Sequence, residues 1–369
     1  MPDTIPLFLP RIDEASVQRV AQTLRSGWIS EGRQVLAFEQ ALCAQFGFPR
    51  ALAVNSGTSA LHLALLALGV GPGDEVITTA QTFVATALAI LYCGATPVFA
   101  DLEPGGANLD PAEIGRRAGP RTKAVLLVHY GGEPCDMDAV LAQAKRHGLA
   151  VVEDAAHALG ARYRSRPVGA LGDAGIFSFQ AIKPLTTGDG GLLVCADPSV
   201  HQKAYRLRWF GMDRAGRTPS ELGQPEWAIT ELGYKYHMND LTASLGLGQL
   251  EGFQTALARR RALDARYRGA LGAVPGLALI PPTDGAEGAC WLFTVLVERR
   301  LDFVRALRSR GVEAAVWHRR IDAHPLFGGL RQDLPRQERF DAAQVSIPLR
   351  DSLDDGEAGA VLDAVRRGW

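Results

Sequence analysis

Short apolar runs alternate with segments of helical spacing through the first two hundred residues. Seven runs are rich in apolar residues and bounded by turn residues: 51–54, 75–80, 96–101, 123–130, 150–156, 175–179 and 191–196. Such short runs are typical of strands that are buried on both faces. Helical spacing lies between several of them, at 61–68, 85–92 and 137–145. Strand and helix in series predict one large α/β domain with a mostly parallel, seven-stranded sheet, although the pattern does not give the order of the strands.

The pattern changes after Asn239. Residues 240–271 keep a helical period without a strand interruption, and their early small residues suit close packing. A strand near 290–297, a helix near 302–311 and a last helix from Asp354 follow Pro- and Gly-rich stretches. We therefore expect a smaller α+β domain at the C-terminus, with residues 1–250 in the large domain and residues 251–369 in the small one.

Composition narrows the class of protein. The chain has 369 residues, 47% of them hydrophobic, which is enough for two packed domains. A net charge of −1 gives no electrostatic reason to expect nucleic acid or an anionic membrane as partner. The five cysteines are scattered and form no C-x-x-C motif, which favours reduced thiols over disulfides or a metal site. We expect a soluble, cytoplasmic protein without a membrane span or metal.

The first candidate site is the stretch "NSGTSALHLAL", where a predicted strand turns into a helix. Ser56, Gly57 and Thr58 lie at this turn. The free backbone N–H groups at a helix start, with hydroxyls beside them, form a cradle for an anion. An ordinary Ser or Thr cap would look the same, so the segment alone leaves both interpretations open.

The second candidate is "VVEDAAHALGA", in which Asp154 follows an apolar strand and precedes small residues. A buried carboxylate needs a partner, and a protonated ring nitrogen would be one. His157 lies three residues further on, close enough to assist. The alternative is a capping Asp followed by a core His with satisfied hydrogen bonds.

The third candidate is "FSFQAIKPLTTGDGG", which places Lys183 among apolar residues. Burial lowers the pKa of a lysine, and the neutral amine can form a Schiff base with an aldehyde. Ser178, five residues earlier, offers a hydroxyl to a phosphate nearby. Two alternatives compete: Lys183 extends to solvent, or the glycine-rich turn binds a nucleotide, although it lacks the P-loop order.

Two further segments add weaker signals. Phe83 follows a predicted strand and would lie flat on a planar cofactor, although core packing explains most single Phe residues. The stretch "GYKYHMNDLTASLGLGQL" from Gly233 is rich in aromatic residues before a helix, as at a subunit contact or an ordinary helix entry. Together, the anion cradle, stacking ring, buried Asp and activated Lys are the groups that pyridoxal phosphate (PLP) requires.

These segments resemble the DegT/DnrJ/EryC1/StrS family of nucleotide-sugar aminotransferases, which have the fold-type I architecture of aspartate aminotransferase. The resemblance covers nearly the whole chain. It begins at "LRSGWISEGRQVLAFEQAL", includes the stretches quoted above, and ends near "VSIPL". It implies a PLP-dependent transferase with a large domain and a smaller C-terminal α+β domain.

The resemblance implies a role for each matching residue. Lys183 matches the lysine that binds the cofactor aldehyde and moves the proton. Asp154 matches the carboxylate that keeps the pyridine nitrogen protonated, and His157 the residue beside the ring oxygen. Phe83 matches the stacking aromatic. The phosphate contacts fall at the turn and strand residues Ser56, Gly57, Thr58 and Ser178.

Three positions depart from the family pattern. Many members have Asn where this chain has Lys235, in a segment that reaches the phosphate of the other subunit; a lysine there would meet it as a point charge. Pro184 stands where Asn is frequent, and Gln180 where His is frequent. Related sugar dehydratases replace the catalytic lysine with histidine, so the retained Lys183 favours amino transfer.

The implied activity is transfer of an amino group from L-glutamate, or glutamine, to a keto sugar linked to a nucleoside diphosphate. A homodimer with shared active sites is expected. Three alternatives stay open: a keto-cyclitol aminotransferase, a PLP-dependent sugar dehydratase, and a non-catalytic PLP-binding regulator.

The substrate contacts are predicted less directly. Trp28, Ile29 and Ser30 are candidates near the N-terminus. A second set lies in "WHRRIDAHP", where the side chains of His318, Arg319 and Arg320 are suited to a diphosphate. A solvated basic surface explains the second stretch equally well.

Overall fold

In the computed structural model, which describes residues 4–213, 216 and 218–369, the seven apolar runs form one sheet. The strand order is β1-β9-β8-β5-β4-β2-β3. Only β9 runs antiparallel to its neighbours in this sheet, β1 and β8, so the predicted mostly parallel sheet is confirmed. The strands are β1 (Ala51–Val54), β2 (Glu75–Thr79), β3 (Thr96–Ala100), β4 (Thr122–Val128), β5 (Ala150–Asp154), β8 (Ala174–Ser178) and β9 (Gly191–Cys195).

Helices cover both faces of this sheet, which explains why its strands are apolar on both sides. Along β4, Val125 and Leu127 pack into one core cluster, whereas Ala124 and Leu126 pack into the other. The helices of the large domain are α2 (Arg33–Phe46), α3 (Gly57–Ala67), α4 (Ala85–Tyr92), α5 (Pro111–Arg117), α6 (Met137–His147) and α7 (Pro198–Arg208).

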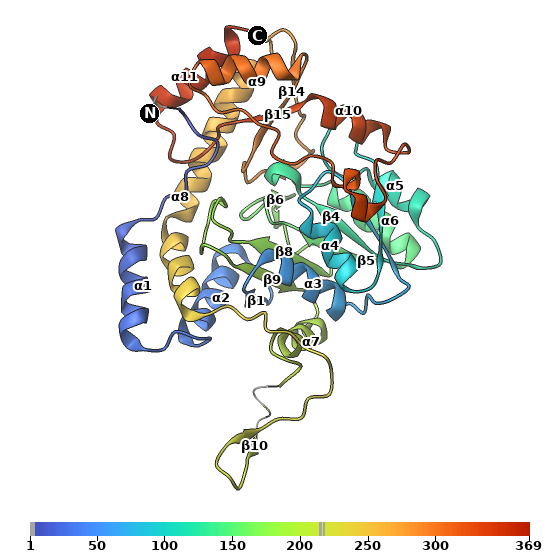
Figure 1. The fold of residues 1–369 in the computed structure, drawn as a ribbon, viewed down its shortest axis with the longest axis vertical. Coiled ribbons are helices and arrows are strands. Elements are labelled where there is room, and N and C mark those ends of the chain that lie inside the picture. The colour runs from blue at the N-terminus through green and yellow to red at the C-terminus, as the bar shows by residue number, and fades with distance from the viewer. Residues whose placement is uncertain (1–3, 214–215, 217) are drawn as a thin grey trace.

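The long helix α8 (Asp240–Leu271) links the two ends of the molecule (Figure 1). Its first half packs beside α1 (Glu14–Ser26) and α2, and its second half enters the C-terminal part. The small residues in its first half allow the close approach: a Cβ on Gly248 would lie 2.4 Å from Ser16 Oγ.

The C-terminal part has its own sheet, of order β12-β14-β15, and its own apolar core. Its predicted strand and helices are present with slightly different bounds. The boundary predicted between residues 250 and 251 falls inside α8 and stays a prediction. The elements are β12 (Leu277–Leu279), β14 (Phe293–Val297), α9 (Arg300–Ser309), α10 (Pro335–Ala343), β15 (Gln344–Ile347) and α11 (Asp355–Arg366).

Short elements complete the fold. A hairpin of β10 (Thr218–Pro219) and β11 (Pro225–Glu226) projects away from the body below α7 (Figure 1). The other short elements are β6 (Arg162–Tyr163), β7 (Arg166–Pro167), β13 (Ala286–Glu287), and the 3₁₀ turns η1 (Tyr130–Gly132), η3 (Ile321–Ala323) and η4 (Pro325–Phe327).

No helix in the described part of the chain is both long and apolar enough to cross a bilayer.

Candidate active site

A pocket of about 440 Å³ lies where β5 and β8 end and α3 begins. The carboxyl edge of a largely parallel sheet is the usual place for such a site, because the loops that follow the strands converge there. The pocket is lined by Ser56, Gly57, Thr58, Leu61, Thr82, Phe83, Ala85, Thr86, Asp154, Ala156, His157, Ile176, Ser178, Gln180, Ile182, Lys183, Asp189, Gly190, Trp291, Trp317 and His318.

The N-terminus of α3 forms one wall of the pocket. Ser56 caps the helix by accepting a hydrogen bond from the Ser59 backbone N–H at 3.1 Å, so the ordinary cap is present and the anion cradle stays a prediction. Gly57 lies against Ser178, where an added Cβ would meet the serine Cβ at 3.1 Å. A Cβ on Gly191, which begins β9, would lie 2.5 Å from the carbonyl carbon of Ser56. These two glycines therefore bring the helix start and the β8–β9 connection into direct contact.

Asp154 is the last residue of β5 and is 4% exposed. Its carboxylate accepts hydrogen bonds from Thr86 Oγ1 at 2.8 Å and from the Ala156 backbone N–H at 3.1 Å. Burial raises the pKa of Asp154, while these two hydrogen bonds and the charge of Lys183 oppose that rise. The carboxylate is thus held in a fixed orientation inside the pocket, as the sequence predicted for a buried Asp.

Lys183 lies in the connection between β8 and β9, where its backbone N–H donates to the Gln180 carbonyl at 2.8 Å. The residue is partly exposed, but its amine points into the pocket over the ring of Trp291, with Nζ 3.7 Å from the ring centroid. Burial lowers the pKa of Lys183 to about 7, and Asp154 opposes the shift. The amine is therefore available as a nucleophile near neutral pH, which does not hold for a lysine extended into solvent.

Two histidines and a phenylalanine complete the inner wall. His157 is buried, and its Nδ1 accepts from the Gly131 backbone N–H at 3.4 Å. His318 lies parallel to it, with centroids 5.3 Å apart and an interplanar angle of 7°. Burial holds the pKa of both rings below the usual range, and that of His318 falls to about 3. Phe83 is 56% exposed, so its ring is open to a ligand and is not packed in the core.

The structure does not bring every predicted residue to this pocket. Lys235 is exposed and does not line it, although its carbonyl accepts a hydrogen bond from Asn55 at 3.2 Å, next to the α3 cradle. Trp28, Ile29 and Ser30 lie in the exposed segment between α1 and α2, and Trp28 is 75% exposed. Within one chain, these four residues stay predictions.

The predicted basic stretch divides in the same way. His318 lines the pocket, whereas the two arginines after it do not. Arg319 forms an ion pair with Asp341 at 2.9 Å, and Arg320 is buried in an ion pair with Asp322 at 2.6 Å. Both guanidinium groups already have carboxylate partners, so a role in binding diphosphate also stays a prediction.

The sequence did not point to Thr86 or Trp291 as residues of the pocket, whereas Trp317 begins the candidate stretch "WHRRIDAHP". Thr86 lies just after Phe83 in the same motif, but nothing in its spacing distinguishes it from an ordinary helix residue. Trp291 belongs to the C-terminal part, where an apolar run predicts only core packing. Its approach to Lys183 depends on how the two parts of the chain pack together.

Comparison with known proteins agrees with this geometry. The sequence profile of the DegT/DnrJ/EryC1/StrS aminotransferase family matches residues 10–366. The spore coat polysaccharide biosynthesis protein SpsC of Bacillus subtilis (strain 168) is 40% identical over 374 residues, covering 98% of this chain and 96% of SpsC.

Two solved structures extend the comparison to the fold. The sugar aminotransferase CalS13 from Micromonospora echinospora is 33% identical, with a TM-score of 0.94, and the match covers 99% of this chain and 100% of CalS13. Spr1654 from Streptococcus pneumoniae, solved in a PLP-form, is 29% identical, with a TM-score of 0.90 over 99% of this chain and 98% of that one. These matches confirm the expected fold-type I architecture. The chain belongs to the DegT/DnrJ/EryC1/StrS aminotransferase family.

Proposed function

We propose that this protein transfers an amino group from L-glutamate to the keto group of a sugar linked to a nucleoside diphosphate. Membership of the family makes the chain a PLP-dependent sugar aminotransferase; the donor and the acceptor are the proposal. The observation that carries it is that Lys183 and Asp154 line one pocket together with a helix N-terminus. SpsC, the relative at 40% identity, is named for polysaccharide biosynthesis, which fits an amino-sugar product.

The residues of the pocket fit PLP. The backbone N–H groups of the first turn of α3, with Ser178 beside them, suit a phosphate. Asp154 suits a protonated pyridine nitrogen, and the exposed ring of Phe83 suits stacking on the cofactor face. His318 Nε2 is buried and has no hydrogen-bond partner in the described part of the chain, so it can bond to a ligand. When bound, PLP supplies an electron sink for the carbanion formed at the substrate carbon.

The side chains of this chain would supply the remaining chemistry. Lys183 Nζ would hold the cofactor aldehyde, and its free amine would take the proton from the donor α-carbon and return it on the acceptor side. A pKa near 7 makes both proton transfers accessible at neutral pH. Asp154, oriented by Thr86, would stabilise positive charge on the ring nitrogen. Trp291 and Trp317 line the pocket from the C-terminal part.

The proposal includes a second copy of the chain as partner. Lys235 is exposed next to the start of α3 and does not line the pocket of its own chain, which is compatible with a contact to a neighbouring subunit. Three large apolar side chains are also open: Trp28 at 75%, Leu222 at 87% and Leu232 at 80%. Such exposure on a projecting hairpin and a helix connection is typical of a surface that is covered in an oligomer. A cytoplasmic location stays a prediction.

The alternatives predict different products. A keto-cyclitol aminotransferase shares the residues expected to hold the cofactor and differs only in its acceptor. A sugar dehydratase releases no amino sugar, and the retained Lys183 disfavours it. A PLP-binding regulator binds the cofactor but does not convert it with a donor. The choice therefore rests on measuring each half of the reaction separately.

The first experiment follows the visible spectrum of the purified protein with PLP, before and after addition of L-glutamate or L-glutamine. We expect the band of lysine-bound cofactor to be lost on adding L-glutamate, with formation of the amine form. Lys183→Ala should show no such band, whereas Lys123→Ala, which changes an exposed lysine, should behave as wild type.

The second half-reaction is tested by mixing the protein that carries the amine form of the cofactor with candidate acceptors. Mass spectrometry should detect an amino sugar from a nucleotide-linked keto sugar, together with return of the original band. An amino-cyclitol product would favour the keto-cyclitol alternative. A stable band that no amino donor converts would contradict amino transfer and favour the regulator or the dehydratase.

A further inference from the structure

Trp291 lies two residues before β14, is 1% exposed, and makes three contacts in the active-site pocket. Lys183 Nζ lies 3.7 Å from the centroid of its ring. The same ring stacks on His157, with centroids 4.0 Å apart and planes inclined by 29°. Its Nε1–H donates to the carbonyl of Ile182 at 3.1 Å. One side chain from the C-terminal part thus contacts the catalytic lysine, the backbone before it, and the neighbouring histidine.

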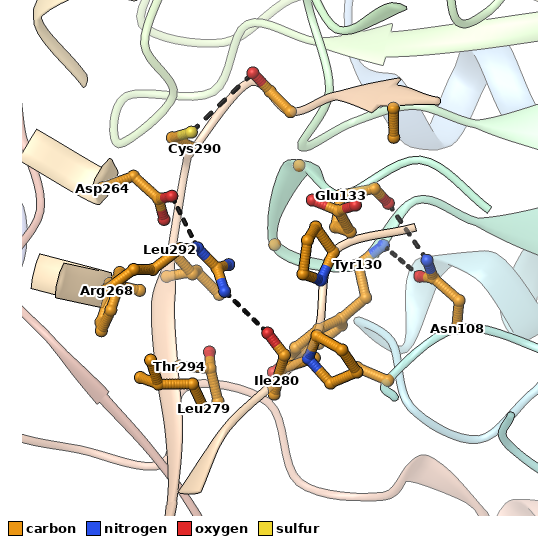
Figure 2. A pocket seen from close by; sticks show the side chains of 18 of the residues that line it. Asn108, Tyr130, Glu133, Asp264, Arg268, Leu279, Ile280, Cys290, Leu292 and Thr294 are labelled. Carbon is orange, nitrogen blue, oxygen red and sulfur yellow. Dashed lines mark hydrogen bonds and ion pairs between the residues drawn. The ribbon is translucent and has the colours of Figure 1, made fainter. Parts of the chain in front are cut away.

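The backbone around Trp291 is held in place by hydrogen bonds to the carbonyl of Gly131. The N–H groups of Trp291 and Leu292 both donate to the Gly131 carbonyl, at 3.0 and 3.1 Å. Cys290, whose φ of 51° lies in the left-handed region, and Leu292 line a separate hollow of about 330 Å³ (Figure 2). The position of the indole is therefore fixed by hydrogen bonds within the chain.

The hollow behind Trp291 is itself held together by paired groups. Figure 2 shows Arg268 between Asp264, at 2.7 Å, and the Ile280 carbonyl, also at 2.7 Å. On the other side, Asn108 accepts from the Tyr130 backbone N–H at 3.0 Å. These hydrogen bonds fix the polar lining of the hollow, whose Gly131 carbonyl also accepts from the backbone of Trp291.

Few charged groups near Lys183 stabilise its ammonium form, so the ring of Trp291 can contribute to that stabilisation. Asp154, at the end of β5, is the carboxylate that favours the ammonium, and Asp189 is exposed at the pocket edge. His157 and His318 face the amine, and both are neutral near pH 7 because their pKa values are lowered. The face of an indole attracts an ammonium ion but has little attraction for a neutral amine.

We propose that Trp291 is a positioning residue that receives the ammonium of Lys183 on its ring face when the lysine is released from the cofactor. The inference rests on the proposed function, in which the lone pair of Nζ takes the proton of the donor carbon and becomes –NH₃⁺. The same proton leaves Nζ when it is returned to the acceptor carbon, so no other group is consumed. Between these events the indole holds the cation beside the reacting centre, while stacking keeps His157 in place.

The decisive measurement needs neither cofactor nor turnover. In the full-length chain freed of cofactor, the rate of acetylation of Lys183 by acetic anhydride is followed by mass spectrometry across pH, which gives the apparent pKa of its amine. Trp291→Leu keeps the site apolar but removes the π face, and should lower this pKa by about 1.5, because a desolvated cation–π contact of roughly 2 kcal/mol is lost. Trp291→Phe keeps a weaker π face and should lower it by less.

Trp317→Leu is the matched control, because Trp317 lines the same pocket while the ring beneath the lysine amine is that of Trp291. It should leave the pKa of Lys183 unchanged. An unchanged or raised pKa in Trp291→Leu would overturn the proposal, as would an equal fall in the Trp317 variant. Melting temperatures establish that each variant is folded, and Trp291→Phe provides the readout if the leucine variant is not.

Activity gives a separate readout. With the holoenzyme, Trp291→Leu should lower kcat by more than it raises KM, because the ring acts on the released lysine and not on substrate binding. Trp291→Phe should recover part of kcat. A rise in KM alone would overturn the proposed role. If no acceptor is turned over by the wild type, the proposed function fails, while the acetylation result still decides whether the ring stabilises the ammonium.

Discussion

At the scale of single residues, Lys183 carries a conflict between stability and reactivity. Its pKa is lowered to about 7 from the 10.5 usual for lysine, so the folded chain binds this proton more weakly than the unfolded chain does. Between pH 7 and pH 10 the unfolded state therefore holds more protons, and the stability of the cofactor-free protein should rise with pH across this window. A group placed for catalysis makes the empty site less stable.

Replacement of Lys183 by methionine should remove this penalty. We expect Lys183→Met to stabilise the cofactor-free protein by on the order of 3 kcal/mol at pH 7, since a pKa displaced by one unit corresponds to about 1.4 kcal/mol. The gain should shrink as the pH rises toward 10. Urea unfolding of both proteins at several pH values measures it.

Lys123→Met serves as the control, because this lysine is exposed on β4 and its replacement should change stability little. A constant difference between Lys183→Met and wild type at all pH values would contradict a titration effect. It would point instead to a simple packing gain from the methionine.

The sequence allowed Lys183, Asp154 and Phe83 to be predicted as pocket residues, but not Trp291. Lys183 and Asp154 are conspicuous because a charge directly after an apolar strand requires an explanation. Trp291 gives no such signal, since an aromatic in a β-rich run is usually core. The ion pair of Arg320 with Asp322 was also hidden, because two residues of opposite charge so close in sequence fit both a solvated loop and a buried pair.

At the scale of elements, two glycines in α8 differ in what an alanine substitution would change: close packing at one position and helix propensity at the other. Gly248 contacts α1 so closely that an added Cβ would lie 2.7 Å from Ser16 Cα, a backbone atom that cannot rotate away. Gly252 lies one turn further along the same helix. Among the residues that the structure describes, no atom outside its own stretch of helix lies within 4 Å of a Cβ added there. The same substitution should therefore have opposite effects at the two sites.

Gly248→Ala should destabilise the protein by about 1–3 kcal/mol, because overpacking forces α1 and α8 apart. Gly252→Ala should stabilise it by roughly 0.5–1 kcal/mol, because alanine loses less entropy than glycine in a helix. Differential scanning calorimetry of the two variants and wild type tests both signs. A stabilising alanine at position 248 would show that α1 does not pack as closely as described.

The seven strands of the main sheet were predictable because each is a short buried run between turns. Their order was not, since it depends on which crossovers pack together and not on any local pattern. The lone antiparallel strand of this sheet, β9, illustrates the limit. Its apolar run resembles those of its parallel neighbours, and only the short β8–β9 connection, which carries Lys183, sets its direction.

At the scale of the whole molecule, the proposed dimer makes a prediction about mixed subunits. If Lys235 serves the pocket of the partner, Lys183→Ala and Lys235→Ala damage different chains of one site. A mixed dimer then contains one site with both defects and one intact site. Mixing the two variants under conditions of subunit exchange should restore about a quarter of wild-type activity, since half of the dimers are mixed and half of their sites are intact.

A mixture of Lys183→Ala with Asp154→Asn is the matched control, because both changes fall in the same pocket and every site stays damaged. It should restore nothing. Equal recovery in both mixtures would contradict the shared site, and so would a wild-type protein that sediments as a monomer while active. The resemblance to the family predicted that Lys235 reaches the site of the other subunit, and this contact stays a prediction because an exposed lysine shows its role only against a second subunit.

The contact between Gly191 and Ser56 has a consequence for recombination between related genes. Two segments that lie far apart in the chain fit only because one of them lacks a side-chain carbon. A shuffled gene that takes the start of α3 from one parent and the start of β9 from another would combine two segments whose shapes are not matched to each other. We expect surviving crossovers to keep both segments from the same parent, so that the two ends of the active site are transmitted as one unit.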